Sequence, residues 1–348
     1  MQIQKGFGFM IQRVSLLEFT NFPKNVEILN LKKCFMKIIN DTLNFTISEE
    51  SAITLGKFDG IHKGHQKLMQ KILEKKEQGL KSVVFTFGQM PGTNIYGKGR
   101  TILTRTERQI HLEAMGIDYM IECPFVPELI QMEPEQFVEK ILVEQLHVKY
   151  IAVGPDFRFG YNRKGSAGLL KQLASVYGYE VEVLEKECLD DKVISSTYVR
   201  HMLEIGEMEK VHKLLGYPYY VSGTVVHGHA IGRTLGIPTI NLIPDEEKML
   251  PPNGVYLTKT MFGHENYFGI TNIGVKPTIS GEELKGIETH LFDFDGNLYD
   301  QQLLVAFYAF ERPERRFESL EELQKQLKED VRWGKIYSPE KCKEMSYD

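Results

Sequence analysis

The sequence predicts an α/β protein of two parts: a domain with a doubly wound parallel sheet, then an antiparallel β-barrel with a terminal helix. Strand-like and helix-like segments alternate between residues 52 and 215, which is typical of a parallel sheet covered by helices. From residue 219 onward, short β-rich runs follow one another without helices between them, which favours a barrel. The length of 348 residues suits two ordinary domains.

The first domain begins with a strand–helix–strand unit. Apolar residues at helical spacing, from Leu68 to Leu73, mark the helix, and β-branched and aromatic residues mark the strand that follows it. Two strands joined by a helix should be parallel. The expected elements are strand Ala52–Leu55, helix His65–Gln78, strand Ser82–Phe87, helix Pro134–Gln145 and strand Tyr150–Val153.

Two helices are expected from Ser196 to Gly206 and over Glu207–Leu215. After them, the helical spacing of apolar residues gives way to short strand-like runs. A capping box, Ser319 to Glu322, begins the last helix. Its apolar stripe, Leu320, Leu323, Leu327 and Val331, should pack on the barrel. The expected strands are Tyr219–Val226, Val255–Phe262, Tyr267–Ile273, Ile287–Phe294 and Leu303–Phe310.

The chain therefore divides into an extension over residues 1–35, a first domain over 36–217 and a second over 218–348. The extension shows no clean period and precedes a second methionine, Met36, where structured sequence restarts. A mitochondrial transit peptide fits poorly, because Glu18 and Glu27 interrupt it and arginine is scarce. We expect residues 1–35 to be an extension or the product of an upstream start.

Composition excludes several classes of protein. Hydrophobic residues at 42% and charged residues at 26% are globular values. A net charge of −5 argues against a broad nucleic-acid surface. The four cysteines, Cys34, Cys123, Cys188 and Cys342, lie far apart, so we expect reduced thiols. No apolar run approaches a membrane span and no secretory signal is seen, which predicts a cytoplasmic protein without a membrane partner, either a monomer or a weak homo-oligomer.

A first candidate site for phosphate follows the first strand. His62 and His65 are three residues apart at a helix start, where backbone N–H groups and the helix dipole attract anions. Gly56, Gly60 and Gly64 would let the backbone approach a ligand closely. The spacing matches neither the dinucleotide fingerprint nor the Walker P-loop. Ordinary surface histidines are the alternative interpretation.

Two further segments could join this site. Ser195, Ser196 and Thr197 lie at another helix start with Arg200 one turn along, which suits either helix capping or an anion clamp. The segment Gly154–Gly160 follows a strand of the sheet, where open α/β sheets bind ligands. Its two aromatic residues, Phe157 and Phe159, could equally belong to the core.

These three segments resemble the adenylyltransferase half of bacterial bifunctional riboflavin kinase/FMN adenylyltransferases, also called FAD synthetases. The matching motifs are G-x-F-D-G-x-H-x-G-H-Q at Gly56–Gln66, D-F-x-F-G at Asp156–Gly160 and I-S-S-T-x-x-R at Ile194–Arg200. The resemblance implies that FMN phosphate attacks the α-phosphorus of ATP, with Mg²⁺ on the leaving pyrophosphate. It implies ATP contacts from Gly56, Phe58, Asp59, Gly60, His62, Gly64, His65, Ser195, Ser196, Thr197 and Arg200, and flavin contacts from Asp156, Phe157 and Phe159.

One departure bears on that reaction. The family usually shows T-F-D-P-x-P after the second strand, whereas this chain has Gly88 and Met90 in that stretch and lacks the acidic residue. If that carboxylate helps to place metal or phosphate, adenylyl transfer could be weakened, lost, or supported by Asp59 or Asp156.

The barrel domain has its own candidate site. Gly228, Gly232 and Gly236 surround Arg233 in a segment suited either to wrapping phosphates or to a plain barrel corner. Thr239 and Asn241 offer two neutral oxygens, two residues apart, for a Mg²⁺ that also binds ATP. Glu288 lies in a strand among apolar neighbours, either as an exposed edge charge or as a functional carboxylate.

The second site resembles that of riboflavin kinases. They share G-R-x-x-G-x-P-T-A-N, here with Ile240 in place of alanine, and V-E-T-H-L, here Ile287–Leu291. The resemblance implies that Glu288 is the general base that deprotonates the 5′-hydroxyl of riboflavin as it attacks the γ-phosphorus of ATP. The alternatives are a kinase whose first domain has little adenylyltransferase activity, and a non-catalytic flavin or nucleotide sensor.

Overall fold

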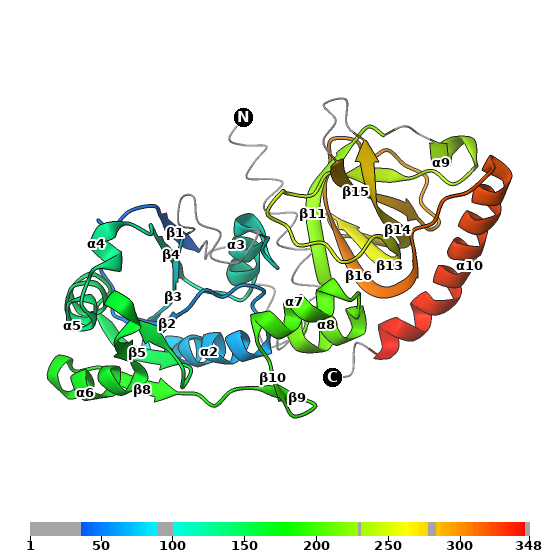
Figure 1. The fold of residues 1–348 in the computed structure, drawn as a ribbon. Helices are drawn as coiled ribbons and strands as arrows, with labels where there is room; N and C mark the ends of the chain where they lie inside the picture. The colour runs from blue at the N-terminus through cyan, green and yellow to red at the C-terminus, as the bar shows by residue number, and fades with distance from the viewer. Residues whose placement is uncertain (1–35, 89–99, 229–230, 278–282, 345–348) are drawn as a thin grey trace. The chain divides into compact units, whose positions relative to one another are not determined.

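The computed structural model describes residues 36–88, 100–228, 231–277 and 283–344 (Figure 1). The predicted extension over residues 1–35 and the position of Met90 lie outside these ranges. The chain forms two compact units. Among the described residues, one unit comprises residues 36–101 together with His111–Ser196, and the other comprises Ile102–Ile110, which includes the first part of helix α3 (Arg105–Ala114), together with the chain from Thr197 onward. Each unit is described by itself.

The first unit contains the predicted parallel sheet of six strands. Its order is β1-β4-β3-β2-β5-β8, and every neighbouring pair is parallel. From β2 the chain moves outward through β3 to β4, and then returns to the other side of β2 with β5 and β8, so the sheet is doubly wound. The strands are β1 Lys37–Asn40, β2 Ser51–Leu55, β3 Lys81–Phe87, β4 Tyr119–Cys123, β5 Val148–Val153 and β8 Glu180–Val183.

Helices accompany this sheet as the apolar patterns predict. The predicted helix over Pro134–Gln145 forms, but only its first turn is α-helical and Phe137–Gln145 is a π-helix. The helices are α2 Lys63–Glu74, η2 Lys75–Gln78, α3 Arg105–Ala114, α4 Pro127–Ile130, α5 Pro134–Gln136, η3 Phe137–Gln145 and α6 Ala167–Tyr177. Short elements complete the unit: β6 Arg158–Phe159, η4 Tyr161–Arg163, β7 Gly165–Ser166, β9 Cys188–Leu189 and β10 Lys192–Val193.

The second unit contains a closed antiparallel barrel in the order β11-β12-β15-β14-β13-β16. Its strands are β11 Tyr219–Val226, β12 Ile240–Leu242, β13 Gly254–Phe262, β14 Glu265–Pro277, β15 Glu283–Leu291 and β16 Gln302–Pro313. Its helices are α7 Ser196–Glu204, α8 Met208–Leu215, α9 Ile231–Thr234 and α10 Leu320–Glu344. The strand predicted to run to Phe294 ends at Leu291.

Side chains alternate between the two faces of the barrel wall. Thr258, Thr271 and Thr289 are fully buried and join in a hydroxyl ladder, with Oγ1–Oγ1 distances of 2.7 and 2.8 Å. The opposite face carries α10, since Gly334 of that helix packs against Ile270 of β14. Because residues two apart in a strand share a face, the helix covers the same face as Asn272.

Helix α10 is held to β16 by a forked ion pair. Arg312 donates from Nε to Asp330 Oδ1 at 3.0 Å and from Nη2 to Oδ2 at 2.5 Å. The predicted capping box forms, with the Glu322 N–H donating to Ser319 Oγ at 3.1 Å. The predicted apolar stripe is wrong at its first position, because Leu320 is 61% exposed. No helix in the described ranges is long and apolar enough to cross a membrane.

A buried ion pair lies at the first turn of α3. Lys248 Nζ donates to Glu107 Oε2 at 2.5 Å and to the Ile102 carbonyl at 2.7 Å. Ser222 donates to Glu107 Oε1 from its backbone N and its hydroxyl, both at 3.0 Å. Glu107 also closes a capping box with Thr104. The pair therefore fixes residues 102–110 within the barrel unit.

Candidate active sites

The doubly wound topology brings two predicted segments together. Strands β2 and β5 are hydrogen-bonded neighbours at the point where the strand order reverses. The loop after β2 carries the histidine motif, and the loop after β5 carries Gly154–Gly160. Ligands of open α/β sheets bind at the carboxyl ends of strands at such a point. The predicted phosphate and flavin segments thus meet at one edge of the sheet.

The two predicted histidines form a stacked pair at the start of α2. Their ring centroids are 3.6 Å apart, and Phe58 packs edge-on against His65 at 5.2 Å. His62 is the N-cap residue, and its Nδ1 accepts a hydrogen bond from the His65 backbone N at 3.4 Å. A side chain at Gly64 would press against the His62 ring at 3.3 Å, so the absence of Cβ makes room for the stack.

Burial keeps this pair uncharged. It lowers the pKa of His62 to about 4. Burial also lowers the pKa of His65 well below its ordinary value, and the neighbouring His62 adds to that effect. Because Nδ1 of His62 accepts a hydrogen bond, its neutral ring carries the proton on Nε2. His62 can therefore donate a hydrogen bond from Nε2 to a phosphate oxygen.

The serine-rich segment joins this loop through Ser196. Its hydroxyl donates to the Asp59 carbonyl at 2.8 Å, and Asp59 itself is 3% exposed. Phe58 and Ile61 adopt positive φ angles of 50° and 38°, which side chains with a Cβ rarely tolerate outside functional loops. The loop is thus held in one unusual shape.

Thr197 and Arg200 group with the barrel unit. There the Arg200 Nη1 lies 3.9 Å from Met249 Sδ. Ser195 is half-buried beside Ser196 in the other unit. A phosphate clamp that combines Thr197 and Arg200 with His62 stays a prediction.

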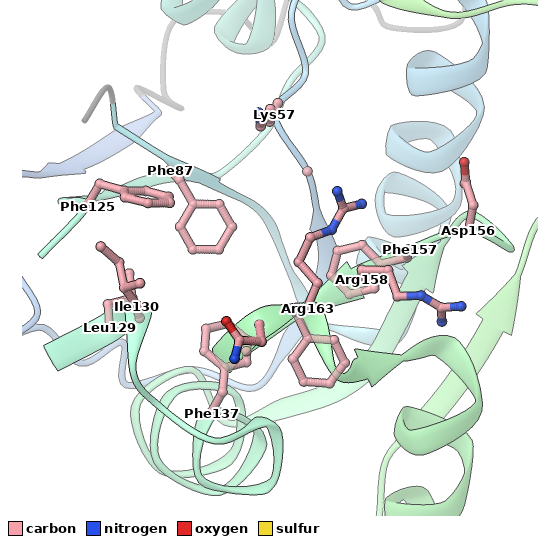
Figure 2. A pocket seen from close by; sticks show the side chains of 14 residues that line it. Lys57, Phe87, Phe125, Leu129, Ile130, Phe137, Asp156, Phe157, Arg158 and Arg163 are labelled. Carbon is pink, nitrogen blue, oxygen red and sulfur yellow. The ribbon is translucent and has the colours of Figure 1, made fainter. Parts of the chain in front are cut away.

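An aromatic cavity of about 780 Å³ opens beside the loop (Figure 2). The predicted Phe157 and Phe159 stack at 5.5 Å in its wall, and Gly56 lines it as well. Asp156 lies at its edge, where its carboxylate pairs with Lys186 at 2.8 Å. Lys186 lowers the pKa of Asp156, so this carboxylate is charged. The cavity is large enough for a planar ring system held between aromatic side chains.

Three cations border the same cavity, Lys57, Arg158 and Arg163, and two of them, Lys57 and Arg163, influence each other electrostatically. In Figure 2 the Arg163 guanidinium extends toward Lys57. The pKa of Lys57 is lowered by burial and by the positive charge of Arg163, and Asp59 partly offsets this. Asn162 and Arg163 are strained, with φ angles of 51° and 57°. Two like charges beside an aromatic cavity suit an anionic ligand with an apolar ring.

Sequence reasoning missed most of this cavity. Its other wall residues are Phe87, Phe125, Leu129, Ile130, Phe137 and Arg158. Phe87 ends β3 and Phe125 follows β4, so each lies at the carboxyl edge of the sheet. That position was the signal that could have identified both.

The stretch that lacks the family acid begins at Gly88. Its N–H donates to the Cys123 carbonyl at 2.7 Å, and a Cβ there would lie 3.9 Å from Glu122 Cγ. Glu122 is 4% exposed. An acidic side chain is therefore present next to the missing one, on the neighbouring strand.

The barrel site is a row of polar residues on one face. Strand β15 lies between β12 and β14, and Glu288 is paired with Asn241 on one side and Asn272 on the other. Thr239 precedes β12 by one residue and shares the face of Asn241 by alternation. Glu288 is half-buried and Asn241 is 6% exposed. The structure thus brings the predicted base and the predicted metal ligands together.

The glycine segment lies against this row. A Cβ on Gly228 would be 2.6 Å from Asn241 Cγ, so only glycine fits beside that carboxamide. Gly232 accepts the backbone N–H of Ile237 at 2.8 Å, and Gly236 turns with a φ of 76°. The exposed side chain of Arg233 lies between these two glycines. Gly232, Arg233 and Gly236 thus form one turn, and Gly228 lies against Asn241.

His290 and Gln324 fasten the turn. The His290 Nδ1 lies 2.8 Å from the Pro238 carbonyl, which can only accept, so the ring donates from Nδ1. Gln324 of α10 donates to the Leu235 carbonyl at 3.0 Å. Sequence reasoning assigned neither residue a role.

The α/β unit and the barrel unit each have a glycine-containing loop suited to binding phosphate. This arrangement indicates a two-domain enzyme that transfers phosphorus-containing groups. Family models agree: one described as FAD synthetase matches residues 44–198, and one described as riboflavin kinase matches residues 215–337. The chain belongs to the family of bifunctional riboflavin kinase/FMN adenylyltransferases.

Individual relatives have the same domain pair. The chain is 34% identical to the bifunctional riboflavin kinase/FMN adenylyltransferase of Haemophilus influenzae, covering 82% of this chain and 94% of that protein. It is 36% identical to the Pseudomonas fluorescens enzyme of that name, covering 80% and 90%. A solved structure from Streptococcus pneumoniae, named as a macrolide-efflux protein, is 29% identical with a TM-score of 0.76, covering 85% of this chain and 97% of that one.

Proposed function

We propose that the chain phosphorylates riboflavin to FMN in the barrel unit and joins FMN to the adenylyl group of ATP in the α/β unit. The observation that carries the proposal is the row in which Glu288 lies beside Asn241, with Gly228 against that carboxamide. The motifs of both units and the relatives named for both activities favour this bifunctional enzyme over a kinase with an inactive first domain.

In the kinase reaction, Glu288 acts as the general base. A glutamate carboxylate within reach of a hydroxyl group can accept its proton. The 5′-hydroxyl oxygen of riboflavin attacks the γ-phosphorus of ATP, its proton passes to Glu288, and ADP leaves. Gly228 and the turn formed by Gly232, Arg233 and Gly236 hold the phosphate chain.

Thr239 and Asn241 fit a magnesium ion. Their oxygens are neutral, which suits a Mg²⁺ whose other ligands are water and ATP phosphates. The space that a Cβ of Gly228 would fill lies directly beside the Asn241 carboxamide. Bound there, Mg²⁺ would neutralise charge on the β- and γ-phosphates.

In the adenylyltransferase reaction, the aromatic cavity holds the flavin ring and Lys57 with Arg163 holds the FMN phosphate. An oxygen of that phosphate attacks the α-phosphorus of ATP, and pyrophosphate leaves. His62 donates from Nε2 to the departing phosphates, next to the backbone N–H groups at the start of α2. Phe58, Asp59 and Gly60 shape this loop around ATP.

The test measures both half-reactions on two variants of the full chain. Glu288→Gln should abolish FMN formation from riboflavin and spare FAD formation from supplied FMN, because an amide cannot accept the proton. His62→Ala should do the reverse. Each variant is the other's folding control, and loss of both activities in either variant would sink the two-site assignment.

We further propose that the enzyme works in the cytoplasm on free riboflavin, FMN and ATP, as a monomer or a weak homo-oligomer. Light scattering at micromolar and submicromolar concentrations tests the assembly. A concentration-independent mass of several chains would contradict it.

A further inference from the structure

The strand register places a second asparagine beside Glu288. Asn272 of β14 is its partner across the β14–β15 pair, as Asn241 is across the β12–β15 pair. Residues directly opposite in antiparallel strands point to one side of the sheet, with Cβ atoms about 4.5–5.5 Å apart. The Glu288 carboxylate is therefore flanked by two carboxamides, of which only Asn241 has a role in the proposed reaction.

Asn272 lies between two acidic side chains. A Cβ on Gly274 would be 3.1 Å from Asn272 Nδ2 and 3.2 Å from Glu314 Cδ, so the amide nitrogen and the Glu314 carboxyl share the space above that glycine. Glu288 lies on the other side, across the strand pair. An ionised carboxylate only accepts hydrogen bonds, whereas an amide nitrogen has two hydrogens to donate. The Asn272 amide nitrogen can thus donate one hydrogen bond to a carboxylate on each side.

The face and the burial of Asn272 fit such a role. It lies on the face that α10 covers, two residues from Ile270, which packs under Gly334. Asn272 and Glu288 are both half-buried, so a hydrogen bond between them would be partly shielded from water. The hydroxyl ladder through Thr271 and Thr289 joins the adjacent positions of the same two strands and holds them in register.

We propose that Asn272 is a positioning residue of the kinase site, which donates an N–H to Glu288 and directs the free carboxylate oxygen toward the riboflavin hydroxyl. The proposal rests on the proposed function. Removal of the donor should impair the orientation of the Glu288 carboxylate.

The experiment measures kcat and KM for riboflavin phosphorylation by the full chain. Asn272→Ala should lower kcat about tenfold at pH 7, the usual worth of a hydrogen bond to a charged group, and leave the KM for ATP unchanged. Asn272→Ser keeps a donor and should recover part of the lost kcat.

Asn253→Ala is the matched control. The Asn253 Nδ2 donates to Glu314 Oε2 at 3.3 Å, so the same change removes an amide donor from Glu314 instead of Glu288. It should leave kcat at the wild-type value. FAD formation from supplied FMN should be normal in every variant, which reports that the chain is folded.

A wild-type kcat in Asn272→Ala would overturn the proposal, as would an equal loss of kcat in Asn253→Ala. The proposed function fails separately: it fails if Glu288→Gln still phosphorylates riboflavin. An inactive Glu288→Gln together with normal Asn272 variants removes only the role of Asn272.

Discussion

Lys248 and Glu107 are both buried, at 0% and 1% exposure of their side chains. The ring of Tyr219 lies 4.5 Å from Lys248 Nζ and adds a cation–π contact. Glu107 accepts from Lys248, from Ser222 twice and from the Thr104 backbone N, so both of its oxygens are fully used. Neither charge can be lost without leaving the other uncompensated in the interior.

Lys248→Met should therefore destabilise the barrel unit by about 3–5 kcal/mol, the usual cost of breaking a buried pair. The double variant Glu107→Gln with Lys248→Met should recover much of that loss, since the Gln amide oxygen still accepts from Ser222. The measurement is the temperature at which kinase activity is lost on heating. Additive losses in the double variant would show that the two side chains are not coupled.

Single residues were predictable where a motif and a strand end coincide. His62, His65, Thr239, Asn241 and Glu288 all lie beside strand ends or within paired strands, and the structure places them in two clusters. The cavity residues were not predictable in this way, because Lys57 and Arg163 come together only through the folding of two separate loops. Nothing in their local sequence says which way a loop turns.

At the scale of elements, helix α10 depends on the charges beneath it. Glu311 is an extra residue of β16 at a β-bulge, opposite no residue of β13. One of its carboxyl oxygens, Oε2, is buried without a hydrogen-bond partner among the described residues. Burial and the nearby Asp330 carboxylate together raise the pKa of Glu311 to about 7, although the positive charge of Arg312 opposes them.

A carboxyl group whose pKa is raised in the fold binds more protons there than in the unfolded chain. Its contribution to stability is thus greatest below about pH 4.5 and is lost as the pH rises through 7. Glu311→Gln removes the charge. We expect its melting temperature to match the wild type at pH 5 and to exceed it at pH 8, measured by circular dichroism. A difference that is constant across this range would contradict the titration of Glu311.

The elements that were predicted followed the apolar pattern closely, with errors at their ends and in helix geometry, but several elements were not predicted at all: β1, β4, β8, β12, α3 and α6. Strand β15 stops at Leu291 because the chain turns at Asp293, which has a positive φ of 56°. The π-helix Phe137–Gln145 has the same apolar residues as an α-helix would, so the pattern could not distinguish them. Leu320 is exposed because it lies in the first turn of α10, ahead of the part that packs on the barrel.

At the scale of the whole molecule, the matches leave part of the chain uncovered. The Haemophilus protein is covered over 94% of its length by 82% of this chain, and the first family model starts at residue 44. The Met36 backbone N donates to Glu113 Oε1 at 3.3 Å, and β1 then pairs with β4. All six strands of the described sheet therefore lie after Met36.

A chain that starts at Met36 should keep both half-reactions at wild-type rates, because its new amino group still lies beside Glu113. A chain that starts at Asn44 is the control. It lacks β1 and exposes the unpaired edge of β4, so we expect it to aggregate. The measurements are the rates of both half-reactions and the yield of soluble protein for each shortened chain. Loss of either half-reaction on removal of residues 1–35 would contradict the prediction and assign those residues a role.

The hydroxyl ladder of Thr258, Thr271 and Thr289 has a consequence for the neighbouring carboxylate. A strand that slips by one residue turns every side chain to the opposite face, and hydrophobic side chains alone tolerate such slippage when both faces are partly covered. Three interlocked hydroxyls do not, because each would lose its partner at once. A slip of β15 would bury Glu288 inside the barrel. The buried threonines thus fix the register of the three strands. Thr289→Val would preserve the size of the side chain while it removes the hydroxyl that bonds to Thr271.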